Sequence, residues 1–278
     1  MHTRLLVSTL LLFAVAVQAQ DYRALWQRGE YARAVEEVER VIEAGDSDVR
    51  VSVLYGDYAD LLFAVGRVDE AIVLSENIVS NYPLPSHIVR LTSFYHYRGR
   101  RAEYRELLDL IGRQMERLRS YRLDEEEQLA IGQLLEMQGE DPQALLAYYE
   151  RLMDEYPAYA PLRVAAGDVA LARRSFAVAA RHYGQALELA GEYQRALAGL
   201  TEAYRASGDP RESDALERLR GFNPHHPRLR LLNAERLLDL GEADAGLAEL
   251  DSLLAINPQH TRALALKGAA FFLQDEHG

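Results

Sequence analysis

Apolar residues recur at helical spacing along most of the chain. In residues 51–65 they are Leu54, Tyr58, Leu61, Leu62 and Val65, and in residues 68–81 they are Ala71, Leu74, Ile78 and Val79. This spacing places the apolar side chains on one face of a helix, whereas a strand would alternate apolar and polar residues. The pattern predicts two amphipathic helices joined by a short turn, and an all-α fold.

The turns between such helices contain a glycine and return at a regular interval. The glycines are Gly29, Gly66, Gly99, Gly139, Gly208 and Gly241, and Arg174 stands in the corresponding place between the fourth and the fifth. A residue that is usually small follows five positions later: Ala34, Ala71, Tyr104, Ala144, Ala179, Ser213 and Gly246. The mean interval is about 35 residues, which lies in the range of helical repeats and predicts roughly seven helix pairs.

Aspartate followed by proline marks the start of two predicted helices. Asp141 precedes Pro142, and Asp209 precedes Pro210 with Glu212 as a second capping residue. An aspartate side chain accepts hydrogen bonds from the first backbone N–H groups of a helix, and proline has no N–H to leave unpaired there. We therefore expect both aspartates to cap helices.

Two stretches carry the repeat most clearly. They are Gly66-Arg67-Val68-Asp69-Glu70-Ala71-Ile72, which runs on to Tyr82-Pro83, and Gly139-Glu140-Asp141-Pro142-Gln143-Ala144, with Tyr148 and Pro157. In these motifs the chain resembles the tetratricopeptide repeat (TPR) family. The resemblance implies a right-handed superhelical solenoid of antiparallel helix pairs over residues 20–278. The repeats would lie at about 21–46, 47–83, 84–119, 120–157, 158–191, 192–224 and 225–258, followed by a capping helix at 259–278.

Other folds also pair helices at a similar period. Closed (α/α) toroids, ankyrin arrays and HEAT arrays are the alternatives. The Thr-Pro-Leu-His signature of ankyrin is missing from the sequence, and a toroid is not expected to repeat a glycine turn with a small residue at a fixed distance. In a solenoid each repeat is expected to contact only its neighbours, which leaves an open concave face.

Residues 1–19 differ from the rest in composition. Arg4 is positively charged, residues 5–17 are almost entirely apolar, and Ala19 ends the segment. This is typical of a secretory signal peptide, so we expect cleavage after Ala19 and export to the periplasm of a Gram-negative bacterium. An uncleaved anchor is the alternative. Because the chain contains no cysteine, we expect no lipid anchor, no disulfide and no thiolate metal site.

Charge and motifs narrow the classes of function. Lysine and arginine number 31 against 43 aspartates and glutamates, a net charge of −12, which is unfavourable for binding nucleic acid. The nucleotide-binding, hydrolase and zinc-protease motifs are not found. His225 and His226 are adjacent, but they fall in a predicted loop. We therefore expect no catalytic, cofactor-binding or metal-binding residues.

In TPR proteins the first helix of each pair lines the concave face. The resemblance places the following residues there: Asp60, Phe63, Ser93, His96, Tyr97, Gln133, Glu136, Asp168, Glu202, Arg205 and Glu235. Several are acidic, which predicts a groove for an extended or helical peptide that carries lysine or arginine. The alternative is that these are ordinary solvated positions of an acidic chain.

The resulting functional hypothesis is a non-enzymatic scaffold or adaptor that binds a partner protein in the periplasm. By analogy with other exported repeat proteins, envelope assembly and secretion are the expected settings. Two alternatives stay open. One is self-assembly through the apolar residues 269–273. The other is a carbohydrate-active enzyme with Asp168 and Glu202 as acid and base.

Overall fold

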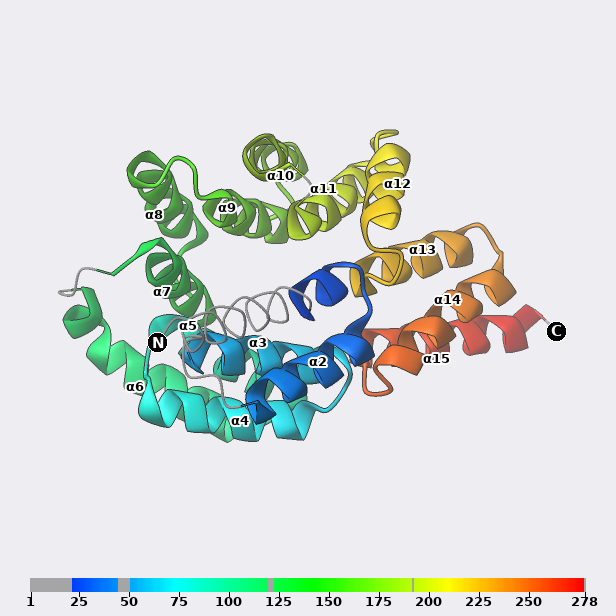
Figure 1. Ribbon diagram of the computed structural model, residues 1–278. Coiled ribbons are helices and arrows are strands. Elements are labelled where there is room, and N and C mark those ends of the chain that lie inside the picture. Colours follow the sequence, from blue (N-terminus) through cyan, green and yellow to red (C-terminus); the bar gives the residue numbers. More distant parts are fainter. Residues whose placement is uncertain (1–21, 45–50, 120–122, 192, 278) are drawn as a thin grey trace, which may run out of the picture. The chain divides into compact units, whose positions relative to one another are not determined.

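The computed structural model describes residues 22–44, 51–119, 123–191 and 193–277, and it is helical without strands throughout these ranges (Figure 1). Residues 22–27 are helical. The helices that follow are α2 (Tyr31–Glu43), α3 (Val51–Ala64), α4 (Val68–Asn81), α5 (Pro85–Arg98), α6 (Arg101–Arg119), α7 (Glu125–Met137), α8 (Pro142–Glu155), α9 (Ala160–Ala172), α10 (Phe176–Ala190), α11 (Gln194–Ser207), α12 (Glu212–Phe222), α13 (Pro227–Asp239), α14 (Ala243–Ile256) and α15 (Thr261–His277). The predicted all-α fold of helix pairs is confirmed. The predicted signal peptide, residues 1–19, lies outside the described residues.

The turn glycines adopt the backbone conformation that the repeat requires. All six have positive φ, for example 82° at Gly66 and 86° at Gly139. Arg174 adopts φ 59° at the corresponding turn, and it is the one non-glycine residue with positive φ in the described part of the chain. L-residues with a side chain are strained in this region, so Arg174 carries a cost that glycine would not.

The length of each turn decides which residue of the second helix is buried. After Gly66 and after Arg174 the helix begins two residues later, and the fifth residue, Ala71 or Ala179, is buried. The two proline-containing turns are longer, since α8 begins three residues after Gly139 and α12 begins four residues after Gly208. The small residues five positions after these glycines, Ala144 and Ser213, therefore do not pack inside. Both are exposed, and Leu145 and Ala215 are buried in their place.

The two expected caps also differ. The carboxylate of Asp141 accepts hydrogen bonds from the backbone N–H groups of Gln143 and Ala144, at 2.9 and 3.0 Å, as a cap at the start of α8. Asp209 instead accepts from the backbone and the guanidinium of Arg211, before α12 begins at Glu212. The Arg211 contacts lower the pKa of Asp209 to about 2.

The chain divides into two compact units. Unit 2 comprises residues 79–222 and is continuous in sequence, whereas unit 1 combines the residues up to 78 with those from 223 onward. No helix in the described ranges is both long enough and apolar enough to cross a membrane.

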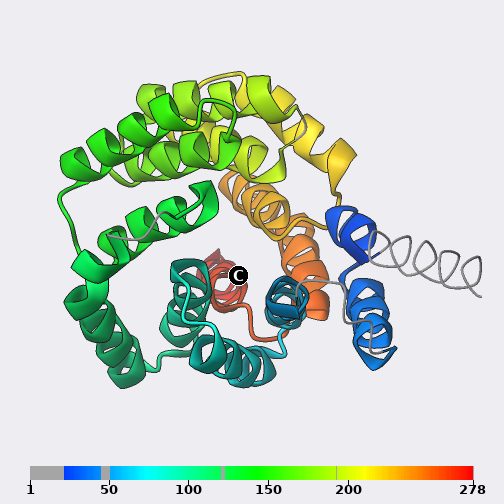
Figure 2. The ribbon, with the colours of Figure 1, turned by 60° about the vertical axis from the view of Figure 1, so that its left-hand side comes forward.

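Unit 2 is a regular stack. Helices that follow one another pack as pairs, and the first helices of the pairs, α5, α7, α9 and α11, pack side by side in that order (Figure 2). One core cluster includes Leu134, Leu145 and Tyr149, and another includes Ala179 and Tyr183. Burying these apolar side chains at about 25 cal/mol per Å² is the main stabilising contribution.

Unit 1 joins the beginning of the described chain to its end, and two asparagine loops make the contact. The Asn223 side chain donates to the Tyr31 hydroxyl at 3.3 Å, and the Asn257 side chain donates to the carbonyl oxygen of Phe63 at 3.4 Å. The expectation that each repeat contacts only its neighbours is therefore wrong in this unit. The repeat period could not predict these contacts, because they join residues nearly 200 positions apart in the sequence.

The two loops are copies of one motif, Asn-Pro-x-His, at Asn223 and Asn257. Each asparagine oxygen accepts from the backbone N–H two residues later, at 3.0 Å in both loops, which holds the carboxamide in a fixed turn. The first loop lies against Gly29 and the second against Gly66, so closely that a Cβ atom on Gly66 would lie 2.8 Å from the Asn257 oxygen. We call these two contacts the asparagine sockets.

Candidate functional site

The predicted groove residues of unit 2 lie on its first helices. Ser93, His96 and Tyr97 are on α5, Gln133 and Glu136 on α7, Asp168 on α9, and Glu202 and Arg205 on α11. Ser93, His96 and Glu136 are exposed, and the others are half-buried. Because these four helices pack side by side, the first-helix positions of successive repeats form one continuous face within unit 2.

Asp168 is the best-anchored acidic residue on this face. Its carboxylate accepts a hydrogen bond from the Tyr183 hydroxyl at 2.6 Å and forms an ion pair with the Arg195 guanidinium at 3.3 Å. Tyr183 comes from the second helix of the same repeat and Arg195 from the first helix of the next. Asp168 is thus tied to three helices, and its negative charge is partly balanced by Arg195.

Glycines place the tyrosine hydroxyls beneath this face. The Tyr183 ring is fully buried against Gly167 and Gly199, where an added Cβ would come within 2.6 Å of the ring from Gly167. Tyr149, one repeat earlier, is equally buried and lies against Gly132 in the same way. Only glycine leaves room for a tyrosine ring at such a close approach between helices.

The two hydroxyls differ in their partners. Tyr183 donates to Asp168, but in the described part of the chain the Tyr149 hydroxyl has no hydrogen-bond partner. Its surroundings include the charges of Glu136, Asp168 and Arg195. Burial and these acidic neighbours raise the pKa of Tyr149, so the phenol stays protonated.

Glu136 is the exposed acidic residue at the centre of the face. Partial desolvation and the nearby Asp168 charge both raise its pKa, because each makes the ionised carboxylate less favourable. Glu136 forms no ion pair with any described residue. A cation placed between Glu136 and Asp168 would relieve this repulsion. We call Glu136, Asp168, Arg195, Tyr149 and Tyr183 the carboxylate cluster.

The remaining predicted residues of unit 2 do not join this cluster. The Ser93 hydroxyl donates to the Val89 carbonyl of its own helix at 2.8 Å. The His96 ring packs on Tyr104, with ring centres 5.4 Å apart. Glu202 and Arg205 have interaction partners of their own. The His96 ring thus packs locally at the α5–α6 turn.

Three predicted groove residues belong to unit 1. Asp60 is half-buried on α3, and Phe63 lies in the last turn of that helix, where its carbonyl oxygen takes part in an asparagine socket. Glu235 on α13 accepts from the Arg262 guanidinium at 2.7 Å. The separation of 27 residues is the same as that between Asp168 and Arg195, so both units use an arginine of the next first helix to balance an acidic residue.

Tyr149, Tyr183 and Arg195 are absent from the predicted site. The sequence did contain a signal, because the two tyrosines are one repeat apart and each is preceded by a helical glycine, Gly132 or Gly167. A tyrosine at helical spacing usually belongs to the core, and the rings do lie there. Only their hydroxyl ends reach the acidic face.

Comparisons with known proteins agree with this architecture. Residues 23–83 match the model of the tetratricopeptide repeat family. The structure of a tetratricopeptide repeat protein from Parabacteroides merdae superposes with a TM-score of 0.55 at 11% identity, over 92% of this chain and 98% of that one. Human IFIT1, solved as a dimer with PPP-AAAA, gives 0.48 at 16% identity over 82% and 55% of the two chains. MamA gives 0.44 at 17% identity over 56% and 87%. No curated protein matches the chain in sequence.

Proposed function

We propose that this chain, which matches the tetratricopeptide repeat model over residues 23–83 and shares the fold of a solved repeat protein, is a non-enzymatic scaffold that binds a partner protein on the first-helix face of unit 2. The family match and the shared fold support binding of a protein partner in general. Which partner is bound depends on the residues of this chain.

The carboxylate cluster supports a partner segment that carries lysine or arginine. The observation that carries this proposal is the exposed Glu136, which forms no ion pair with any described residue and whose pKa is raised by partial desolvation and then by the nearby charge of Asp168. An incoming ammonium or guanidinium group would pair with Glu136 and favour its ionised form. Such charge complementarity accelerates association and selects among partners more than it adds affinity.

Export to the periplasm is part of the same proposal. It is supported by the composition of residues 1–19. A scaffold delivered there would serve envelope assembly or secretion by holding one component in reach of another. Mass spectrometry of the chain recovered from a periplasmic fraction should find Gln20 as the first residue. An intact Met1 on a cytoplasmic chain would contradict the proposal.

Photo-crosslinking tests the binding face in the native cell. A photoreactive phenylalanine replaces Gln133 on α7, and the matched control replaces Gln185, an exposed residue of α10. We expect one crosslinked partner from position 133 that is missing from position 185, identified by mass spectrometry. Equal crosslinking from both positions would contradict a specific face.

Charge reversal then tests the basic segment. With the identified partner, Glu136→Lys should weaken binding by about tenfold and reduce its dependence on salt. Glu188→Lys is the matched control, because Glu188 is an exposed glutamate on α10. If both variants bind as the wild type does, the carboxylate cluster does not recognise the partner.

A further inference from the structure

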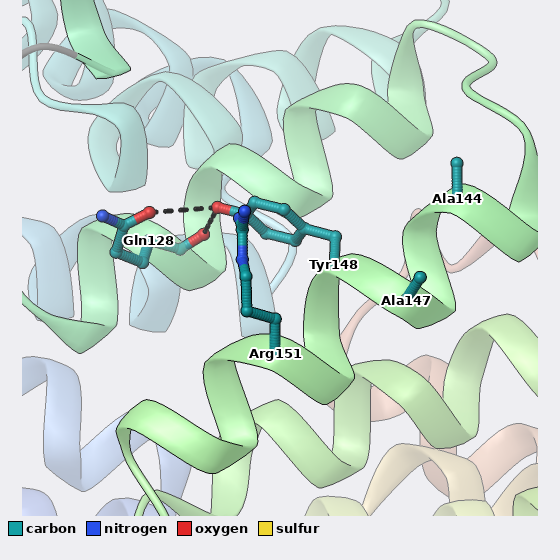
Figure 3. A pocket seen from close by; sticks show the side chains of 5 residues that line it. All are labelled: Gln128, Ala144, Ala147, Tyr148 and Arg151. Carbon is teal, nitrogen blue, oxygen red and sulfur yellow. Dashed lines mark hydrogen bonds between the residues drawn. The ribbon is translucent and has the colours of Figure 1, made fainter.

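Unit 2 contains a pocket of about 530 Å³ beside α7 and α8 that differs from the carboxylate cluster in charge. Among the described residues it is lined by Gln128, Ala144, Ala147, Tyr148 and Arg151 (Figure 3). The four α8 residues are spaced by three or four positions and therefore form one stripe along the helix. None of the described lining residues is acidic, although the chain carries a net charge of −12.

Arg151 is held in place by an aromatic ring. Its guanidinium lies over the Tyr148 ring, 5.3 Å from the ring centre. The Tyr148 hydroxyl is fixed in turn by the backbone oxygen of Gln128 at 2.9 Å and by its side-chain oxygen at 3.1 Å (Figure 3). A stacked guanidinium keeps its N–H groups at the edge available for a ligand.

Arg151 forms no ion pair with any described residue. Glu155 follows one turn later on the same helix, which is a spacing that commonly pairs opposite charges. Many other arginines of the chain are paired, as Arg195 is with Asp168 and Arg262 with Glu235. Arg151 thus places a positive charge, unpaired among the described residues, at a pocket that is also lined by the small apolar side chains of Ala144 and Ala147.

We propose that this pocket binds a carboxylate group of a peptide segment. One guanidinium offers two parallel N–H donors, which match the two oxygens and the single negative charge of a carboxylate. Ala144 and Ala147 leave room for the methylene groups next to it. The inference rests on the pocket alone and goes beyond the proposed function, since the ligand group has the opposite charge to that taken by the carboxylate cluster.

Nuclear magnetic resonance of the arginine Nε–H groups in the whole chain provides the test. The probes are three short peptides: Ac-Ala-Glu-Ala-NH2 with a side-chain carboxylate, Ac-Ala-Ala-Ala-OH with a terminal carboxylate, and the neutral Ac-Ala-Gln-Ala-NH2. We expect a saturable shift of the Arg151 signal with one or both carboxylate peptides, with a Kd on the order of 1 mM, and none with the neutral peptide. The peptide that binds identifies the source of the carboxylate.

Variants separate recognition from general effects. Arg151→Met should remove the Arg151 signal. Binding to this variant is measured through the backbone amide signal of residue 147, and it should be weakened by at least about tenfold. Ala147→Leu fills the pocket without changing charge and should weaken binding about fivefold. Arg181→Met, an exposed arginine on α10, is the matched control and should bind normally. Equal shifts with the neutral peptide, or unchanged binding by Arg151→Met, would overturn the proposal.

Discussion

The two units use the same repeat for different purposes. In unit 2 the turn glycines Gly99, Gly139 and Gly208 face open space, and the turns only reverse the chain. In unit 1 the equivalent turns at Gly29 and Gly66 receive the asparagine sockets, whereas the turn at Gly241 faces open space as those of unit 2 do. A glycine that serves only backbone conformation in one unit therefore also makes a tertiary contact in the other.

The largest expected effect separates these two uses of glycine. Gly29→Ala should destabilise the chain by about 3 kcal/mol, because the new Cβ is strained at φ 80° and also displaces the Asn223 side chain. Gly139→Ala has a similar φ but open space around it, and it should cost only about 1 kcal/mol. Denaturant unfolding of both variants measures the difference. Equal costs would mean that the socket contributes nothing.

A second test concerns the glycines beneath the tyrosines of unit 2. Gly167→Ala pushes a Cβ into the buried Tyr183 ring and should destabilise the chain by about 2 kcal/mol. The control is Gly184→Ala on α10, which meets nothing within 4 Å and should stabilise the chain by about 0.5–1 kcal/mol through helix propensity. Thermal unfolding distinguishes the two. A neutral Gly167→Ala would show that the tyrosine can move aside.

Acid should weaken unit 1 through the histidine of its first asparagine loop. Burial and then Arg228 lower the pKa of His226 to about 4. The folded state therefore binds a proton less readily than the unfolded state, so stability is lost as pH falls from about 6.5 toward 4, by about 2 kcal/mol. His260 in the second loop and His182 in unit 2 shift in the same direction through burial.

Hydrogen exchange at several pH values measures this loss separately in residues 22–44 and 223–277. His226→Gln cannot gain the proton and should flatten the pH dependence in these segments. If the variant follows the wild-type curve, other groups cause the acid sensitivity.

The smallest expected effect is a gain. Arg174→Gly places glycine at the turn with φ 59° and should stabilise unit 2 by about 1 kcal/mol, as relief of backbone strain. The melting temperature should rise by a few degrees. An unchanged or lower value would mean that the Arg174 side chain, or the greater freedom of an unfolded chain with glycine, offsets the relief.

The sequence predicted local structure well and tertiary detail unevenly. Apolar periodicity and glycine turns depend on neighbouring residues, so the bounds of α4 and the positions of the turns followed from them. The burial of Leu145 rather than Ala144 depends on one extra residue in a turn, which a fixed count from glycine misses. Asp168 lies on a first helix, as the repeat register predicts, but its pairing with Arg195 depends on the packing of the next helix, which the register does not give.

The asparagine sockets lay beyond sequence reasoning for another reason. The Asn-Pro-x-His motif is visible twice, but its contact depends on how small rotations between many repeats add up. The Arg151 pocket was equally hidden, because the sequence shows an ordinary helical arginine near Glu155. Only the structure shows that the ring of Tyr148 holds this guanidinium instead.

The discontinuous make-up of unit 1 has a consequence for the order of folding. Unit 2 is one contiguous segment, so all of its residues are present once Phe222 has been made. Tyr31 and Phe63 must wait for Asn223 and Asn257, and closing so long a loop is slow and entropically costly. Folding should thus begin in the middle of the chain and finish by recruiting its two flanks. A chaperone that binds the unfolded chain would therefore have to protect the residues around Tyr31 and Phe63 longest, although they are synthesised early.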